Sequence, residues 1–179
     1  MTDEEKPARK APRKVTPAYL QRAALAYLER YASSAENLRR VLRRKVEKRC
    51  RLRGDDPAEF HEMIDEVVAK SLRSGLIDDT RYAEARVATL RRRGGSTRAI
   101  QAKLSAKGID RSTIAAALEG DDSDEENAAH ALARRRKLGP FRPGERAPYR
   151  DKDLAALVRA GFRFDVARRV VDGESEDIA

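Results

Sequence analysis

The segment formed by residues 64–87 constrains the fold more than any other part of the chain, because it combines a helix, a tight turn and a second helix start in one register. Its apolar residues recur at helical spacing, at Ile64, Val67, Val68 and Leu72. Gly75 can adopt the left-handed conformation that ends a helix, and Asp78 or Asp79 can cap the helix that follows. The segment therefore predicts short, capped helices joined by tight turns.

Three more helix starts precede this turn. Thr16 followed by Pro17 is typical of an N-cap with proline at the first helical position. Residues 33–36 fit a capping box for a second helix, and Asp56 with Pro57 predicts the start of a third. We therefore expect three helices in the first part of the chain.

The same alternation of caps and glycines continues to the end of the chain. Ser96 and Asp110 are expected to cap two helices that follow a helix over about residues 80–93. A third, weaker triplet follows, and placing Gly161 on Gly108 aligns Leu157 with Leu104 and Phe162 with Ile109. The sequence thus predicts an internal repeat of three helices.

Repeats of this kind bury their apolar stripes partly against their neighbours. We therefore expect an all-α fold, an elongated tandem array of three three-helix repeats. The predicted boundaries are a flexible basic arm at 1–15, repeats at 16–77, 78–120 and 121–172, and a frayed acidic tail at 173–179.

The composition favours several small cores and a polyanionic partner. Leu, Ile, Val and Phe make up only about a fifth of the residues, which argues against one large core. The formal charge is +9, and 39% of the residues are charged. Such a surface attracts nucleic acid or acidic protein faces, although a merely soluble surface laced with salt bridges is the alternative.

The cations gather in three runs at positions that resemble one another between repeats. The first run contains Arg39, Arg40, Arg43, Arg44, Lys45, Lys48 and Arg49. The second contains Arg91, Arg92, Arg93, Arg98, Lys103 and Lys107, and the third contains Arg134, Arg135, Arg136 and Lys137. Three unbalanced runs predict a continuous track that contacts phosphate or an acidic protein face.

The sequence offers little for catalysis. Asp78 and Asp79, with Glu84 nearby, are more typical of helix capping than of a magnesium site, because no other segment supplies convergent ligands. His61 and His130 lie far apart and have no zinc-ligand spacing. No phosphate-binding loop motif is present. We therefore expect no metal and no cofactor.

Residues 97–118 imitate a helix-turn-helix motif, but their second helix presents mostly alanine. Only Arg111, Ser112 and Thr113 could reach base edges, so a packing unit is the favoured interpretation. Cys50 is the single cysteine, which excludes an internal disulfide and agrees with a reducing compartment; its arginine neighbours would favour the thiolate. No run approaches the roughly 18 apolar residues of a membrane span, so we expect a cytoplasmic protein.

One run of residues resembles a known family. It consists of Gly75, Leu76, Ile77, Asp78, Asp79, Thr80, Arg81, Tyr82 and Ala83. The likeness extends over about residues 16–171 and includes Lys107-Gly108-Ile109 and Ala160-Gly161-Phe162. On these residues the chain resembles the family of the regulatory protein RecX.

The resemblance implies three tandem three-helix repeats that lodge in the helical groove of the RecA–DNA filament. It also implies a non-catalytic inhibitor of the recombinase, ATPase and coprotease activities of RecA, and we expect it to act as a monomer. Its partners would be the RecA filament and single-stranded or filament-bound DNA. A sequence-tolerant helical DNA-binding protein that acts without RecA is the alternative. A nuclease that uses Asp78 and Asp79 is less favoured.

Overall fold

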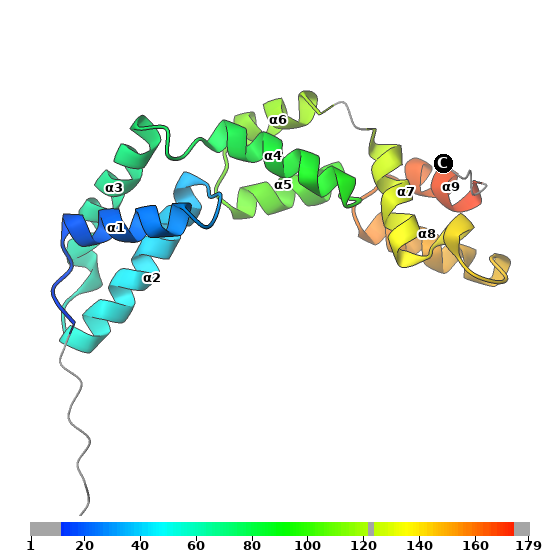
Figure 1. Cartoon of the computed structure of the whole chain (residues 1–179). Helices are drawn as coiled ribbons and strands as arrows, with labels where there is room; N and C mark the ends of the chain where they lie inside the picture. Colours follow the sequence, from blue (N-terminus) through cyan, green and yellow to red (C-terminus); the bar gives the residue numbers. More distant parts are fainter. Residues whose placement is uncertain (1–11, 122–123, 174–179) are drawn as a thin grey trace, which may run out of the picture. The chain divides into compact units, whose positions relative to one another are not determined.

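The computed structural model describes residues 12–121 and 124–173, and all regular elements in this part of the chain are helices (Figure 1). The α-helices are α1 (Pro17–Leu28), α2 (Ala35–Arg53), α3 (His61–Arg73), α4 (Asp79–Arg92), α5 (Thr97–Ala106), α6 (Arg111–Glu119), α7 (Glu125–Arg136), α8 (Arg150–Arg159) and α9 (Phe164–Asp172). Short 3-10 helices occupy Pro57–Phe60, Gly139–Phe141 and Ala147–Tyr149. The prediction of an all-α fold made of three-helix repeats is confirmed.

Each helix triplet encloses its own apolar core. One core lies among α1, α2 and α3 around Leu38 and Ile64, the next among α4, α5 and α6 around Ile100, and the last among α7, α8 and α9 around Leu157. In every triplet the third helix packs on the first. The chain divides into two compact units, residues 1–78 and 79–179, so that the second unit holds two of the triplets.

Local capping explains where the helices begin. Thr16 Oγ1 accepts the amide of Tyr19 at 3.2 Å, and Ser96 and Asp110 accept the corresponding amides of α5 and α6. The expected capping box at residues 33–36 is wrong by one position, because Ser34 caps α2 by accepting the amide of Asn37.

The turn at Gly161 repeats the turn at Gly108, as the sequence alignment predicts. Both glycines have positive φ, 77° at Gly108 and 98° at Gly161. The amide of Ile109 donates to Leu104 at 3.2 Å, and the amide of Phe162 donates to Leu157 at 3.3 Å. These bonds satisfy the last carbonyls of α5 and α8 and direct a buried apolar side chain into each core.

The predicted basic arm is shorter in the structure than the sequence suggests. Val15, assigned to the flexible arm, is buried in the first core, and the carbonyl of Pro12 accepts a hydrogen bond from Arg53 at 2.8 Å. The arm therefore cannot extend to residue 15, because this apolar side chain gains more from the core than from solvent. The rest of the arm, 1–11, and the tail after Gly173 lie outside the described residues.

Several apolar residues of the expected helical stripes are exposed instead of buried. They include Leu72 of the predicted stripe at residues 64–72, and three further apolar positions at helical spacing in the sequence, Tyr31, Val158 and Phe164. Within the described ranges, no helix combines the length and the apolar character needed to cross a membrane.

Candidate anion-binding site

The cationic run on α2 is partly neutralised by its own neighbours. Arg39 donates to Asp65 at 2.7 Å and to Glu36 at 2.6 Å, and Arg40 donates to Glu36 at 3.1 Å. Arg49 lies 3.9 Å from the centre of the Tyr19 ring. The prediction that this run is unbalanced is therefore wrong for Arg39 and Arg40. Of the other predicted residues here, Arg44 is exposed and Arg43 is half-buried.

Arg91 is the main correction to the second run, because it is buried. Its side chain is 7% exposed, and its Nε donates to Asp121 at 3.0 Å. Its Nη1 donates to the carbonyl of Gly95 at 3.2 Å, and its Nη2 donates to Thr97 Oγ1 at 2.6 Å. Arg91 therefore cannot belong to a surface track, and a test that reverses it together with its neighbours would damage the fold.

The Arg91 contacts are part of a network that joins the second triplet to the third. The Thr97 hydroxyl accepts from Arg91 and donates to Glu125 at 2.9 Å, while the Thr97 amide donates to the same carboxylate at 3.2 Å. Since Glu125 begins α7, this carboxylate ties α7 to the start of α5.

Two close backbone approaches hold the same junction. Ser96 Oγ donates to the carbonyl of Ala160 at 2.7 Å while it accepts the amide of Ala99. Gly94 has φ 78°, and a Cβ there would lie 2.6 Å from the amide nitrogen of Leu132 on α7. A Cβ on Gly161 would lie 2.5 Å from Ser96 Oγ. The two triplets of the second unit are therefore joined by buried polar bonds and by contacts that only glycine permits.

A cationic pocket lies at this junction. It has a volume of about 350 Å³ and is lined by residues of α4, α5 and α7, the turn between α4 and α5, and Ala160. Its cations are Arg93, Lys103, Arg135 and Arg136, and no carboxylate is among its lining residues within the described ranges. We call it the junction pocket.

The junction pocket brings together parts of the second and third cationic runs. Arg93 and Lys103 belong to the second predicted run, and Arg135 and Arg136 belong to the third. Their convergence depends on the packing of α7 against the end of α4, which no local pattern reveals.

The remaining predicted cations lie elsewhere. Arg92 is exposed, and Lys107 is exposed at the C-terminal end of α5. Arg98 lies with Arg111 in a separate groove of about 530 Å³ between α5 and α6. Arg134 packs over the Phe141 ring, 5.2 Å from its centre.

The helix-turn-helix likeness at residues 97–118 does not supply free side chains for base recognition. The hydroxyls of Ser112 and Thr113 donate to the Asp110 carboxylate at 2.5 and 2.7 Å. These hydrogen bonds hold the pKa of Asp110 well below its ordinary value, and the bond from Ser112 has the largest effect. Two of the three candidate residues are therefore committed to capping α6.

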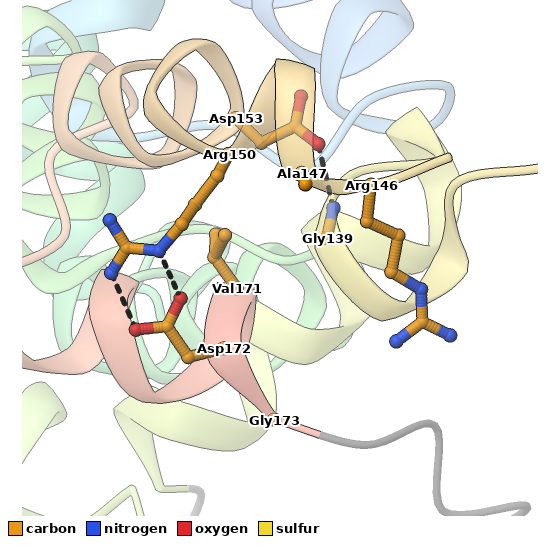
Figure 2. A pocket seen from close by; sticks show the side chains of 8 residues that line it. All are labelled: Gly139, Arg146, Ala147, Arg150, Asp153, Val171, Asp172 and Gly173. Carbon is orange, nitrogen blue, oxygen red and sulfur yellow. Dashed lines mark hydrogen bonds and ion pairs between the residues drawn. The ribbon is translucent and has the colours of Figure 1, made fainter. Parts of the chain in front are cut away.

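A second hollow, of about 190 Å³, lies in the third triplet (Figure 2). Unlike the junction pocket, it is lined by carboxylates as well as by cations, among the residues that the structure describes. Arg150 there donates two hydrogen bonds to Asp172, at 2.7 and 2.6 Å. Asp153 accepts the amide of Gly139 at 2.8 Å and is also paired with Arg142. Arg150 and Asp153 are therefore already paired, and Arg146 is the other charged residue, besides Asp172, that lines this hollow within the described ranges.

Comparison with known proteins identifies the family. A family model described as "RecX, second three-helix domain" matches residues 78–118, which take in nearly all of α4, α5 and α6. A regulatory protein RecX of Myxococcus xanthus is 44% identical over 167 residues, covering 91% of this chain and 89% of the relative. The chain belongs to the RecX family.

Other members of the RecX family agree. A regulatory protein RecX of Agrobacterium fabrum is 32% identical over 164 residues, covering 89% of this chain and 87% of the relative. The crystal structure of RecX from Lactobacillus salivarius matches with a TM-score of 0.60 and 23% identity, over 87% of this chain and 94% of that one. Another crystal structure, of a regulatory protein RecX, matches with a TM-score of 0.63 and 22% identity, over 88% of this chain and 72% of that one. At these identities, the two solved structures show the shared fold alone.

The residues that carry the RecX resemblance have structural positions. Gly75 has φ 71° after the end of α3, and Asp78 and Asp79 stand where α4 begins. Ala83 is fully buried in the second core, with Tyr82 packed against that core, whereas Leu76 and Arg81 are exposed. Gly108 and Gly161 form the equivalent turns described above. No group of three or more metal-ligating side chains occurs among the residues described here.

The expectation for Cys50 is also corrected. The thiol is fully buried in the first core, and this burial raises its pKa despite the arginines beside it in the sequence. A thiolate is therefore disfavoured, because desolvation outweighs the neighbouring positive charge.

Proposed function

We propose that this protein modulates RecA by binding in the groove of the RecA–DNA filament and limiting strand exchange, ATP hydrolysis and coprotease activity. The observation that carries this proposal is the 44% identity to a regulatory protein RecX across 91% of the chain. In this proposal, the protein acts as a monomer in the cytoplasm, without a cofactor and without catalysis of its own.

The charge of the protein supports this proposal. A RecA–DNA filament presents phosphates and acidic side chains, and a protein of net charge +9 is drawn to such a surface before specific contacts form. The exposed cations Arg92, Arg93 and Lys103 of the second unit are available for those contacts. Occupation of the groove would hinder incoming DNA and the addition of further RecA subunits.

One assay tests the proposal directly. RecA is assembled on single-stranded DNA, and ATP hydrolysis is followed while this protein is added at increasing ratios to RecA. We expect inhibition at ratios well below those that saturate the free DNA, because a protein in the groove acts on many assembled subunits.

The alternative predicts a different result. A sequence-tolerant DNA-binding protein would inhibit only when it coats the DNA, and preformed filaments would resist it. Unchanged ATP hydrolysis at every ratio, with preformed and nascent filaments alike, would refute RecA modulation.

A further inference from the structure

We propose that the junction pocket binds a phosphate group of the DNA backbone, with Arg93 and Lys103 on one wall and Arg135 and Arg136 on the other. This inference deepens the proposed function, on which its biological meaning rests. The predicted binding involves only the protein and DNA, so it can be tested without RecA.

The charge of the pocket is uncompensated. Within the described ranges, none of its four cations forms an ion pair or a hydrogen bond with another side chain, and no carboxylate lines the pocket. Arg39 on α2 and Arg150 in the hollow of Figure 2 differ in this respect, because they are paired with carboxylates of Glu36, Asp65 and Asp172. Four like charges around one hollow repel one another, and an anion would relieve that repulsion.

The walls of the pocket are held in place. The Arg91–Thr97–Glu125 contacts and the bond from Ser96 to Ala160 fix the end of α4 and the start of α5 against the third triplet. Because these bonds are already made, the backbone segments that carry the four exposed cations need little rearrangement when a ligand binds. Preorganisation of this kind lowers the entropic cost of binding.

The lining of the pocket favours a phosphodiester over an acidic protein face. Its uncharged surface comes from Gly94, Gly95, Ser96, Ala99 and Ala160, with Leu90 and Leu132 beneath, and it contains no aromatic side chain. Protein interfaces are usually anchored by large aromatic residues in the centre of the contact, which are missing from this lining. Small side chains instead let a sugar-phosphate backbone approach closely, and arginine forks match phosphate oxygens.

The absence of aromatic residues from this lining also predicts how the pocket reads DNA. Single-stranded DNA is usually gripped by stacking of bases on aromatic rings, which this lining cannot provide. Contacts to phosphates alone carry no sequence information. The pocket should therefore bind DNA without regard to its sequence and with strong salt dependence.

The test measures binding of the full chain to a fluorescently labelled oligothymidylate, by anisotropy, without RecA and over a range of salt concentrations. Two double variants each remove one cation from both walls of the pocket. One combines Arg93→Gln with Arg135→Gln, and the other combines Lys103→Gln with Arg136→Gln. The matched control is Lys152→Gln with Arg159→Gln, which removes the same charge from exposed positions on α8. Thermal unfolding followed by circular dichroism confirms that every variant is folded.

We expect both pocket variants to lose about tenfold or more in affinity and to flatten the dependence of log K on log salt by about one to two units, whereas the control stays within about twofold of wild type. To locate the bound DNA, backbone amide chemical shifts are followed by NMR. The amides of Gly95 and Ser96 should show large changes on titration with the oligonucleotide. Equal behaviour of pocket and control variants would overturn the inference.

The outcomes also separate this inference from the proposed function. If the pocket variants bind DNA normally but no longer inhibit RecA, the pocket contacts an acidic protein face and the phosphate assignment is wrong. If wild type leaves RecA unaffected while the pocket variants lose DNA binding, the pocket assignment stands and RecA modulation fails.

Discussion

Arg91 carries a positive charge in the interior of the second unit, and each of its guanidinium nitrogens has an acceptor. Taking a guanidinium out of water is costly, and only a complete set of partners compensates for that cost. Two of these partners, Gly95 and Thr97, belong to the turn and helix start that frame the junction pocket. Arg91 therefore holds the turn and the helix start beside the pocket in place, and it is not itself expected to contact an anion.

Replacing Arg91 by Ala should lower the free energy of unfolding by about 3 kcal/mol, because the nearly buried Asp121 would lose its ion pair with Arg91 and the Gly95 carbonyl would lose a donor. Chemical denaturation measures this change. Arg92→Ala is the matched control, since that neighbouring arginine is exposed and should change stability by less than about 0.5 kcal/mol. Similar stabilities of the two variants would contradict the structural role of Arg91.

Asp153 gives the third triplet a dependence on acid. Its side chain is buried, which by itself would raise its pKa, but hydrogen bonds from Arg142 and from the amide of Gly139 favour the charged form and hold the pKa below the ordinary value of 3.8. A carboxyl whose pKa is lower in the folded state contributes its stability above the unfolded-state pKa. That contribution is lost as the pH falls through the folded-state value.

We therefore expect Asp153→Asn to be clearly less stable than wild type at neutral pH, and to lose less further stability between about pH 5 and the acid limit. Denaturation curves at several pH values measure both effects. Asp151→Asn is a suitable comparison, since the Asp151 side chain is 95% exposed and weakly paired. An acid profile of Asp153→Asn parallel to that of wild type would show that the carboxylate has no such role.

At the scale of the helices, the contact between α4 and α7 depends on one residue without a side chain. Gly94 brings the end of α4 against Leu132 and the carbonyl of Ala128, where a Cβ would lie within 2.9 Å of three atoms. Backbone atoms supply two of those contacts, so the neighbour cannot move aside as a flexible side chain would. The spacing of the two walls of the junction pocket follows from this approach.

Gly94→Ala should therefore cost roughly 3 kcal/mol or more, from backbone strain at φ 78° together with the steric clash. Gly144→Ala separates the two causes, because Gly144 has φ 83° but nothing within 4 Å of a Cβ, and it should show only the strain of about 1 kcal/mol. Chemical denaturation of both variants gives the difference. An equal loss of unfolding free energy in the two variants would mean that α7 moves aside easily and that the steric clash does not matter.

Helices and most of their starts could be predicted because their signals are local. Thr16, Ser96 and Asp110 cap helices within three residues of themselves, and the turn at Gly161 repeats the residues around Gly108. The cap of α2 lies one residue later than predicted, because the capping-box pattern pairs Ser33 with Glu36, whereas Ser34, the actual cap, has Asn37 three residues later. The sequence pattern also took Glu36 as part of the cap, whereas this side chain pairs with arginines of its own helix.

The candidate site could be predicted only in part, because it depends on bonds between distant residues. Arg91 reaches Asp121 across 30 positions, and Ser96 reaches Ala160 across 64. Nothing in the run of three arginines distinguishes the buried Arg91 from the exposed Arg92 except its place on the inner face of α4. The merging of two cationic runs in one pocket depends on the same packing.

At the scale of the whole molecule, a chain with few large apolar residues and a charge of +9 is divided among three small cores in two compact units. Small cores leave much of the chain at the surface, where its charge can act on a polyanion. An elongated body with one arginine-bearing edge stays a prediction. Low-angle X-ray scattering of the full chain, which reports the maximum dimension, is the measurement that checks it.

Cys50 lies at the centre of one of these cores, fully buried and the only thiol in the chain. An alkylating reagent can reach it only when the first helix triplet opens. The rate of alkylation therefore reports the opening equilibrium of that triplet, and should rise with denaturant. A new surface cysteine would react far faster, so a dye could be attached there without replacing the natural thiol.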